Sequence, residues 1–374
     1  MGGWVRRGQK WSQIGVSGSG MARFAATTRE VWRRSADAAP ARHPWVMASR
    51  RQLPRKWREE PFTVRDALAA GVTPDRLRGR DLERPFHGVR VDPVGLVELS
   101  RFGDFASARA ADEFGRLVAR CRAGATRLGS DQFFSHVTAA RLWKAPLGSS
   151  FGPGEPLDVS VRHPGRAPRA RGIAGHQARA DAAICDRFGL PVADPASTFI
   201  ALGRRLDHDD LVAVGDHLVL DPPVLDPADM RPYVTLAGLR ERVAGFSGWG
   251  AAAAASAIRD VREGVEARTE SLLRLLLVRA GLPEPEVGVD IFDRDGRWLG
   301  RADMLFRDWR VVTEYDGEQH RTSTTQYHRD ETRIENFNRA GYPTVRIRKA
   351  HLFGHPEIAV ERVTRALRSA GWGG

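Results

Sequence analysis

The alternation of apolar and polar residues is most regular in the last third of the chain. There it predicts a helix over Glu263–Ala280, followed by three strands over Glu286–Phe292, Leu299–Phe306 and Arg310–Asp316. A second helix over Tyr327–Ala340, a strand over Thr344–Arg348 and a final helix over Pro356–Ser369 complete the pattern. Gly281 and Gly341 directly follow the first two of these helices, as helix stops often do. We therefore expect an α/β domain of order αβββαβα over residues 261–374.

A second pattern, in residues 59–100, predicts two short helices followed by a turn and a strand. Thr63 and Asp66 have the spacing of a capping box, and Thr73-Pro74 opens the next helix with proline in its first turn. Helix, tight turn, helix and a hairpin-like segment are the layout of a winged helix-turn-helix module.

Two arginines of this module, Arg76 and Arg78, fall on or just after its second predicted helix. There they would contact DNA phosphates and dock the protein on a duplex. The alternative interpretation is a small helical domain that packs only against its own chain.

The middle of the chain, residues 101–225, predicts a mixed α/β region that includes a strand at Leu157–Val161 and a helix capped by Ser135. Of its histidines, His136, His163 and His176 are scattered without the spacing of metal ligands. We interpret them as packed or solvated side chains. The Pro-rich stretch Asp221–Pro232 predicts a linker, and residues 226–260 are expected to be a linker and an Ala-rich helix.

The positive charge is concentrated at the N-terminus. The net charge is +12, but residues 1–60 alone carry 13 Lys and Arg against 4 Asp and Glu. Residues 1–58 show no sustained periodicity, which favours a disordered basic leader or a start codon placed too far upstream. Alternatively, they form a basic arm with affinity for phosphate. Because the remainder is nearly neutral, charge alone does not establish nucleic-acid binding.

Composition excludes several classes of protein. No run of about 20 apolar residues is present, so we expect no membrane span. The N-terminus has no apolar segment behind its arginines and does not resemble a secretory signal. Two distant cysteines, Cys121 and Cys185, predict neither a disulfide framework nor a metal knuckle. We expect a cytoplasmic protein.

Acidic residues interrupt two of the apolar strands of the C-terminal domain. A two-residue loop at Asp308-Trp309 would place Asp303 directly opposite Glu314, with Cβ atoms about 4.5–5.5 Å apart. Asp316 follows Glu314 by two residues and should share its face. We therefore predict that three carboxylates converge at one end of this hairpin.

Three carboxylates this close repel one another unless they bind a cation, and oxygen ligands favour Mg²⁺ or Mn²⁺. We predict that Asp303, Glu314 and Asp316 bind this metal. His320 is a candidate general acid or base, and Glu270 on the preceding helix is a further catalytic candidate. The alternatives are solvent-facing acids at the strand ends and an ordinary surface ion pair between Glu270 and Arg274.

Arg333 on the following predicted helix lies three residues after Asp330. It either orients residues of the site, or touches phosphate, which makes it a nucleic-acid-binding candidate, or forms a local pair with Asp330.

The residues that carry this pattern are Glu270, Asp303 in RADMLF, the segment VVTEYDGEQH with Glu314, Asp316, Gly317 and His320, and RDETRIENFNRAGY followed by TVRIR. Through these residues and segments, the region Val261–Trp372 resembles the very-short-patch-repair-like endonuclease domains of the PD-(D/E)XK superfamily. The resemblance implies a restriction-endonuclease-like αβββαβ core, Mg²⁺-dependent hydrolysis of DNA, and catalytic roles for these acids.

The sequence departs from the superfamily pattern in two ways. The superfamily often has lysine two residues after the second acid, where this chain has Asp316, and the nearest later lysine, Lys349, lies beyond the next strand. By the same count across the hairpin that pairs Asp303 with Glu314, Arg301 lies opposite Asp316. The structural zinc of mismatch-repair enzymes of this type is not expected with two distant cysteines.

The N-terminal winged-helix domain of AbiEi-type antitoxins is similar to two segments of this chain, FTVRDALAAGV and LRGRDLERPFHGV. The region that follows that domain in such proteins is similar to SHVTAARLW. The leading hypothesis is a DNA-docked, metal-dependent endonuclease, with a toxin or defence partner left open. The rival hypothesis is a non-catalytic, antitoxin-like regulator with a degenerate nuclease domain. A nuclease directed at RNA is a weaker third, since the chain contains no RNA-reading motif.

Overall fold

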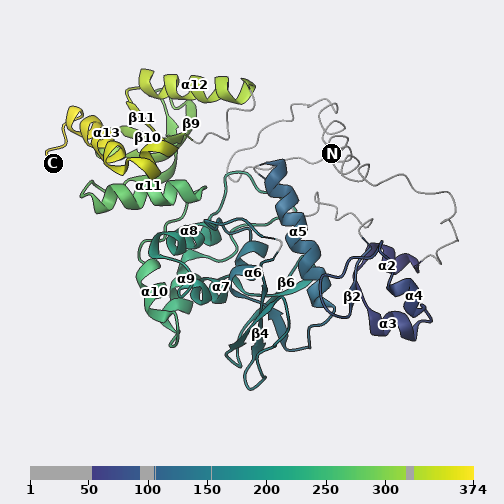
Figure 1. Cartoon of the computed structure of the whole chain (residues 1–374). Coiled ribbons are helices and arrows are strands. Elements are labelled where there is room, and N and C mark those ends of the chain that lie inside the picture. Colours follow the sequence, from purple (N-terminus) through teal and green to yellow (C-terminus); the bar gives the residue numbers. More distant parts are fainter. Residues whose placement is uncertain (1–52, 93–104, 106, 153, 317–323) are drawn as a thin grey trace.

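The computed structural model describes residues 53–92, 105, 107–152, 154–316 and 324–374, with the side chains of helix α12 described from Glu331 onward. Within these residues the chain is mixed α/β, with a two-stranded, a five-stranded and a four-stranded sheet. Figure 1 shows an N-terminal, a middle and a C-terminal region, coloured purple, teal and green to yellow. The expected α/β class is confirmed at this level. None of the helices in the described ranges is long and apolar enough to cross a membrane.

The N-terminal region is small and closely follows its sequence signals. Its elements are α2 (Arg55–Glu59), β1 (Phe62–Thr63), α3 (Val64–Ala69), α4 (Pro74–Leu77) and β2 (Val89–Arg90), with β1 and β2 antiparallel. The predicted caps are present, since Thr63 Oγ1 accepts from the Asp66 amide at 3.1 Å and Thr73 Oγ1 accepts from the Arg76 amide at 3.3 Å. A separate small apolar core, with Phe62 and Leu77 at its centre, holds these elements together.

The middle region contains the five-stranded sheet, in the order β5-β4-β3-β7-β6. Its elements are α5 (Ala108–Ala125), β3 (Gln132–Phe134), α6 (His136–Leu142), β4 (Leu157–Arg162), β5 (Ile173–Ala178), β6 (Ile184–Arg187), β7 (Leu190–Ala193), α7 (Pro195–Leu202), α8 (His208–Val219), α9 (Leu236–Ala244) and α10 (Ala251–Ala257). The pairs β3–β4 and β6–β7 are antiparallel, whereas β4–β5 and β3–β7 are parallel.

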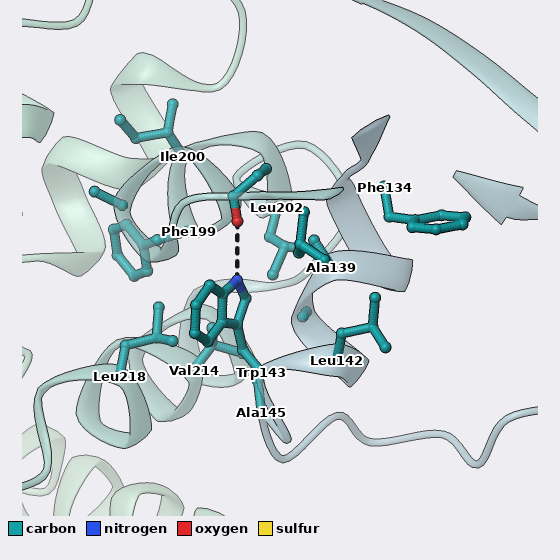
Figure 2. Packing of buried hydrophobic residues seen from close by; sticks show 14 of the residues in the cluster. Phe134, Ala139, Leu142, Trp143, Ala145, Phe199, Ile200, Leu202, Val214 and Leu218 are labelled. Atoms are coloured by element: carbon teal, nitrogen blue, oxygen red, sulfur yellow. Dashed lines mark hydrogen bonds between the residues drawn. The ribbon is translucent and has the colours of Figure 1, made fainter. Parts of the chain in front are cut away.

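The core of this region surrounds Trp143. Figure 2 shows its indole packed near Phe199, Val214 and Leu218, with Nε1 donating to the carbonyl oxygen of Ala193 at 2.9 Å. A buried indole needs such an acceptor, because an unpaired N–H in an apolar core is costly. The single polar atom of this large side chain is thereby satisfied.

Residues 226–260, expected to be a linker and an Ala-rich helix, contain two helices that pack on the middle core. Leu239 and Val243 of α9 and Ala254 and Ala257 of α10 are buried in it. The Ala-rich helix is present as α10, but the segment as a whole belongs to the middle region. Its composition alone did not indicate this, because Ala and Pro carry little amphipathic signal.

The C-terminal region has the predicted order αβββαβα. Its elements are α11 (Arg268–Arg279), β8 (Glu286–Phe292), β9 (Trp298–Phe306), a 3₁₀ turn (Arg307–Trp309), β10 (Val311–Asp316), α12 (Thr324–Arg339), β11 (Thr344–Arg348), a π-helical turn (Ala350–Gly354) and α13 (Pro356–Ser369). The first helix begins at Arg268 and not at Glu263, after Gly264 in a left-handed conformation (φ 93°). The sheet order is β11-β10-β9-β8.

Helices cover both faces of this sheet (Figure 1). Phe337 of α12 packs on one face against Ile291, Leu305 and Val312. On the opposite face a second core contains buried residues of α11, α13 and the sheet, namely Leu273, Leu277, Met304, Phe306, Val311, Ile347, Ala359, Val363 and Leu367. The result is a layered α/β/α arrangement in which β9 and β10 lie at the centre.

Helix α11 also connects this region to the middle one. Its Leu275 belongs to the middle core. Beside it, the fully buried Arg274 lies 3.6 Å from Asp216 of α8. The Asp216 carboxylate further accepts from Ser271 Oγ and from the Arg262 amide, both at 2.7 Å. The two regions thus share one helix and one buried polar network.

Candidate functional site

The register of β9 against β10 is the one predicted. Phe306 pairs with Val311 and Met304 with Thr313, so that Asp303 follows in line with Glu314. The predicted two-residue loop is wrong, because the connection is a 3₁₀ turn closed by Arg310 in the left-handed region (φ 55°). The register is still the predicted one, because the longer connection takes one residue from the end of β9 and one from the start of β10.

At Asp303 and Glu314 the regular backbone ladder gives way to side-chain contacts. The Asp303 amide donates to Glu314 Oε1 at 3.3 Å, and the Tyr315 amide donates to Asp303 Oδ2 at 2.8 Å. Each carboxylate therefore binds the backbone of the neighbouring strand just beyond the last strand pair, Met304 with Thr313. We refer to Asp303 and Glu314 with these contacts as the acid pair.

Glu314 is the more deeply buried member, with 4% of its surface exposed. The pKa of Glu314 is raised to about 8, chiefly by burial and also by the neighbouring Asp303 carboxylate, while Arg333 acts in the opposite direction. Arg333 of α12 donates from Nη2 to Glu314 Oε2 at 2.7 Å. A Cβ on Gly300 would lie only 2.8 Å from the Arg333 side chain, so the glycine gives this arginine its path to the acid.

Glu270 lies in the first turn of α11 and is coupled electrostatically to the acid pair. Burial raises the pKa of Glu270 well above its ordinary value, and the Asp303 carboxylate contributes to the increase. Its Oε2 accepts from the Glu266 amide at 2.9 Å. The alternative partner, Arg274, binds Asp216 and Glu284 instead. Glu270 is thus within electrostatic reach of Asp303.

Asp316 is held by arginines of the neighbouring strand β11. Its Oδ2 lies 3.1 Å from Arg346 Nη2 and 3.8 Å from Arg348 Nε. β10 and β11 are parallel, which puts Arg346 beside Glu314 and Arg348 beside Asp316. Arg346 therefore brings positive charge to the position where the resemblance expects a lysine.

The predicted three-carboxylate cluster is only partly assembled. Among the described residues, no three of these acids bring oxygen atoms within 4.8 Å of one another. Arg301, considered as a partner for Asp316, instead binds Glu266 at 2.9 Å and lies 3.7 Å from Asp290. His320 and the side chain of Asp330 lie outside the described residues.

The two arginines predicted to dock on DNA differ in exposure. Arg76 is 11% exposed and forms a bidentate ion pair with Asp81 at 2.9 and 3.3 Å. Arg78 is 71% exposed and pairs with Asp75 at 2.8 Å. Arg76 thus has a structural role inside the module, whereas Arg78 is presented to solvent.

A second polar cluster, which the sequence analysis did not identify, lies on the five-stranded sheet. Ligand atoms of His136, Asp158 and His176 all lie within 4.8 Å of one another. Ser135 occupies the predicted cap position of α6, but its side chain caps no amide and contacts His136 instead. One signal was available: in LDVSV, Asp158 and Ser160 alternate with three buried apolar residues, so they share the opposite face.

Comparisons with known proteins add no external guide to either site. No family model, no curated protein and no solved structure matches this chain. A function for the chain must therefore be argued from the chemistry of its own residues.

Proposed function

We propose that the C-terminal region is a metal-dependent phosphodiester hydrolase that acts on DNA. The observation that supports this most is the acid pair, in which Asp303 and Glu314 are fixed by each other's strand at the centre of the sheet. Fixing the buried Glu314 carboxylate beside the partly buried Asp303 carboxylate is unfavourable for a purely structural role, because like charges repel. Such an arrangement is typical of sites that bind a divalent cation.

The order of elements supports the same proposal. The run α11, β8, β9, β10, α12, β11 is the αβββαβ succession that the resemblance to restriction-endonuclease-like domains implies. The acids lie on the two central strands, β9 and β10, and on α11 beside them. Proteins with this core and these acids in these places are the ones the sequence resembles.

The donor atoms fit Mg²⁺ or Mn²⁺. The acid pair supplies carboxylate oxygens from two neighbouring strands, and carboxylate oxygens are the ligands that these ions prefer. Asp303 and Glu314 would hold the ion, with Glu270 supporting them. When bound, such an ion activates water and stabilises charge on a phosphoryl oxygen.

The remaining residues have supporting roles in this proposal. Arg333 fixes the rotamer of Glu314, and Arg346 supplies the positive charge that lysine supplies in related sites. Asp316 orients Arg346. His320 would move a proton near the reacting phosphate. The N-terminal region, with its winged-helix-like layout, would dock on DNA through Arg78 and neighbouring exposed residues.

One observation favours the rival function, a non-catalytic regulator that binds DNA through its N-terminal region. Arg333 neutralises Glu314, and Arg346 and Arg348 neutralise Asp316, without a metal ion. In a regulator these ion pairs would be permanent. The two functions differ in metal affinity, which calorimetry with Mn²⁺ measures directly.

The decisive experiment is cleavage of supercoiled plasmid with Mg²⁺ or Mn²⁺ by the full chain and three variants. Asp303→Asn and Glu314→Gln remove one negative charge each at nearly constant shape, and both should abolish cleavage. Asp308→Asn is the matched control, since Asp308 is an exposed acid in the turn of the same hairpin. Equal cleavage by wild type and Asp303→Asn would identify a contaminating nuclease and refute the proposal.

A further inference from the structure

The second polar cluster is built from three separate elements of the middle region. His136 begins α6, Asp158 lies on β4 and His176 lies on β5. His176 Nε2 is 2.7 Å from Asp158 Oδ1, and the two imidazole rings stack with centroids 3.8 Å apart. Asp158 is 5% exposed. Two imidazoles and a buried carboxylate are thus held together by the fold and not by sequence proximity.

Strand register and backbone conformation bring these side chains together. The parallel register of β4 and β5 sets Ser160 beside His176, and the alternation along β4 puts Asp158 on the same face. His136 has φ 46°, a left-handed conformation that is unfavourable for residues with a Cβ. Strain of this kind persists where the surroundings enforce it, and it is concentrated at functional sites.

Neighbouring hydroxyl groups orient the first imidazole. Ser135 Oγ is 2.9 Å from His136 Nδ1 and accepts a hydrogen bond from Ser160 Oγ at 2.7 Å. In the tautomer in which Nδ1–H donates to Ser135, the Nε2 atom of His136 carries a free lone pair. Hydrogen bonding of one ring nitrogen to fix the other is the usual support of a metal-binding histidine.

The cluster opens on a cavity of about 1080 Å³. His136, His176, Ser135 and Ser160 all line it, together with residues of α7 and of the segment that joins α9 to α10. Arg205 also lines the cavity and lies 3.7 Å from Asp158 Oδ1, but 47% of its side chain is exposed. It is therefore free to turn toward solvent when another cation approaches Asp158.

We propose that His136, Asp158 and His176 bind a divalent transition metal, with a further coordination position open to the cavity. Imidazole nitrogen with one carboxylate oxygen is a donor set suited to Zn²⁺ and its neighbours, and three protein ligands leave room for water or a ligand. Mg²⁺ prefers oxygen and does not suit this set. The site lies on a different sheet from the acid pair and is independent of the proposed hydrolysis.

The test is titration of the metal-free, tag-free full chain with Co²⁺ and Zn²⁺, followed by calorimetry and by the visible absorption of bound Co²⁺. We expect one tight equivalent in wild type. His176→Gln and His136→Gln should each weaken it by about 100-fold or more, because even partners outside the ligand sphere contribute 10–100-fold. His208→Gln is the matched control, since His208 contacts only one carboxylate in the described residues, Asp260 at 2.7 Å.

Glu314→Gln should bind Co²⁺ as wild type does, which separates this proposal from the hydrolase. Far-UV circular dichroism and urea unfolding establish that each variant is folded. Ser135→Ala removes only a supporting hydroxyl and should weaken the binding of Co²⁺ by about 10-fold. The proposal is overturned if wild type binds no stoichiometric Co²⁺ or Zn²⁺. It is equally overturned if folded His136 and His176 variants bind these ions as tightly as the His208 variant.

Discussion

Replacing Arg274 by Met tests whether the buried network of α11 and α8 holds the C-terminal region on the middle one. Arg274 is 1% exposed and its buried acidic partner, Asp216, is also 1% exposed. Removing one partner of a buried ion pair leaves the other charge uncompensated, which costs about 3–5 kcal/mol. Asp216 retains two hydrogen-bond donors, Ser271 and the Arg262 amide. We therefore expect the lower end of this range, about 3 kcal/mol.

Asp216→Asn, which changes the other partner of this ion pair, should lower the free energy of unfolding by less than Arg274→Met does. Arg274 keeps Glu284 at 3.0 Å as a partner, and the Asn side chain keeps one acceptor oxygen. The expected cost is about 1.5 kcal/mol, at the lower end of the range for a lost hydrogen bond to a charged group. The double variant should be more stable than the sum of the single losses implies, by about 1–2 kcal/mol, because the two side chains share one network.

The matched control for this series is Arg279→Met on the same helix. Arg279 also pairs with an acid of α8, Asp209, but it is 51% exposed. An exposed pair contributes about 0–1 kcal/mol and weakens with salt. Urea unfolding of the full chain, followed by tryptophan fluorescence and far-UV circular dichroism at low and high NaCl, measures all four variants. If Arg274→Met costs no more than Arg279→Met, the network does not stabilise the fold.

Three further predictions concern other parts of the chain. Burial lowers the pKa of His217 to about 3, so the unfolded state binds its proton first as pH falls below 6.5. Wild type should therefore lose up to about 2 kcal/mol relative to His217→Asn between pH 6.5 and 5. Gly215→Ala should cost about 1–3 kcal/mol, because its new Cβ would lie 2.4 Å from Val261. Arg78→Ala should weaken DNA binding and lower the salt slope by about 1.

Each of these predictions has its own comparison. Burial raises the pKa of Asp216 to about 6, which acts in the opposite sense, but it affects wild type and the His217 variant equally and cancels in their difference. A difference that does not change with pH would contradict the His217 prediction. Gly245→Ala has no contact closer than 3.5 Å and should be nearly neutral. Arg76→Met should lower stability and, unlike Arg78→Ala, leave the salt slope unchanged.

The C-terminal fold was predictable because its signals are local. Strand lengths, helix stops and the facing of Asp303 and Glu314 follow from alternation and from counting across one hairpin. The turn type was not predicted, since a 3₁₀ turn with Arg310 in a left-handed conformation has no glycine or asparagine to announce it. The counting still succeeded because it depends on symmetry about the turn and not on loop length.

The parts that were missed depend on pairings between distant segments. The contact of Asp316 with Arg346 requires β10 and β11 to pair in parallel across the whole of α12. The cluster of His136, Asp158 and His176 requires the parallel register of β4 and β5 and the left-handed start of α6. Spacing along a sequence carries no information about such registers, so scattered histidines are indistinguishable from packed ones until the sheet is known.

Helix α11 connects the proposed hydrolase site to the middle region. Its first turn brings Glu270 within electrostatic reach of Asp303, while Arg274, one turn later, is held against Asp216 of α8. Because a helix is rigid over so short a distance, the middle region fixes where Glu270 stands relative to the acid pair. A loss of the buried network should therefore lower hydrolysis even where the C-terminal sheet remains folded. Arg279→Met, which leaves that network intact, should not.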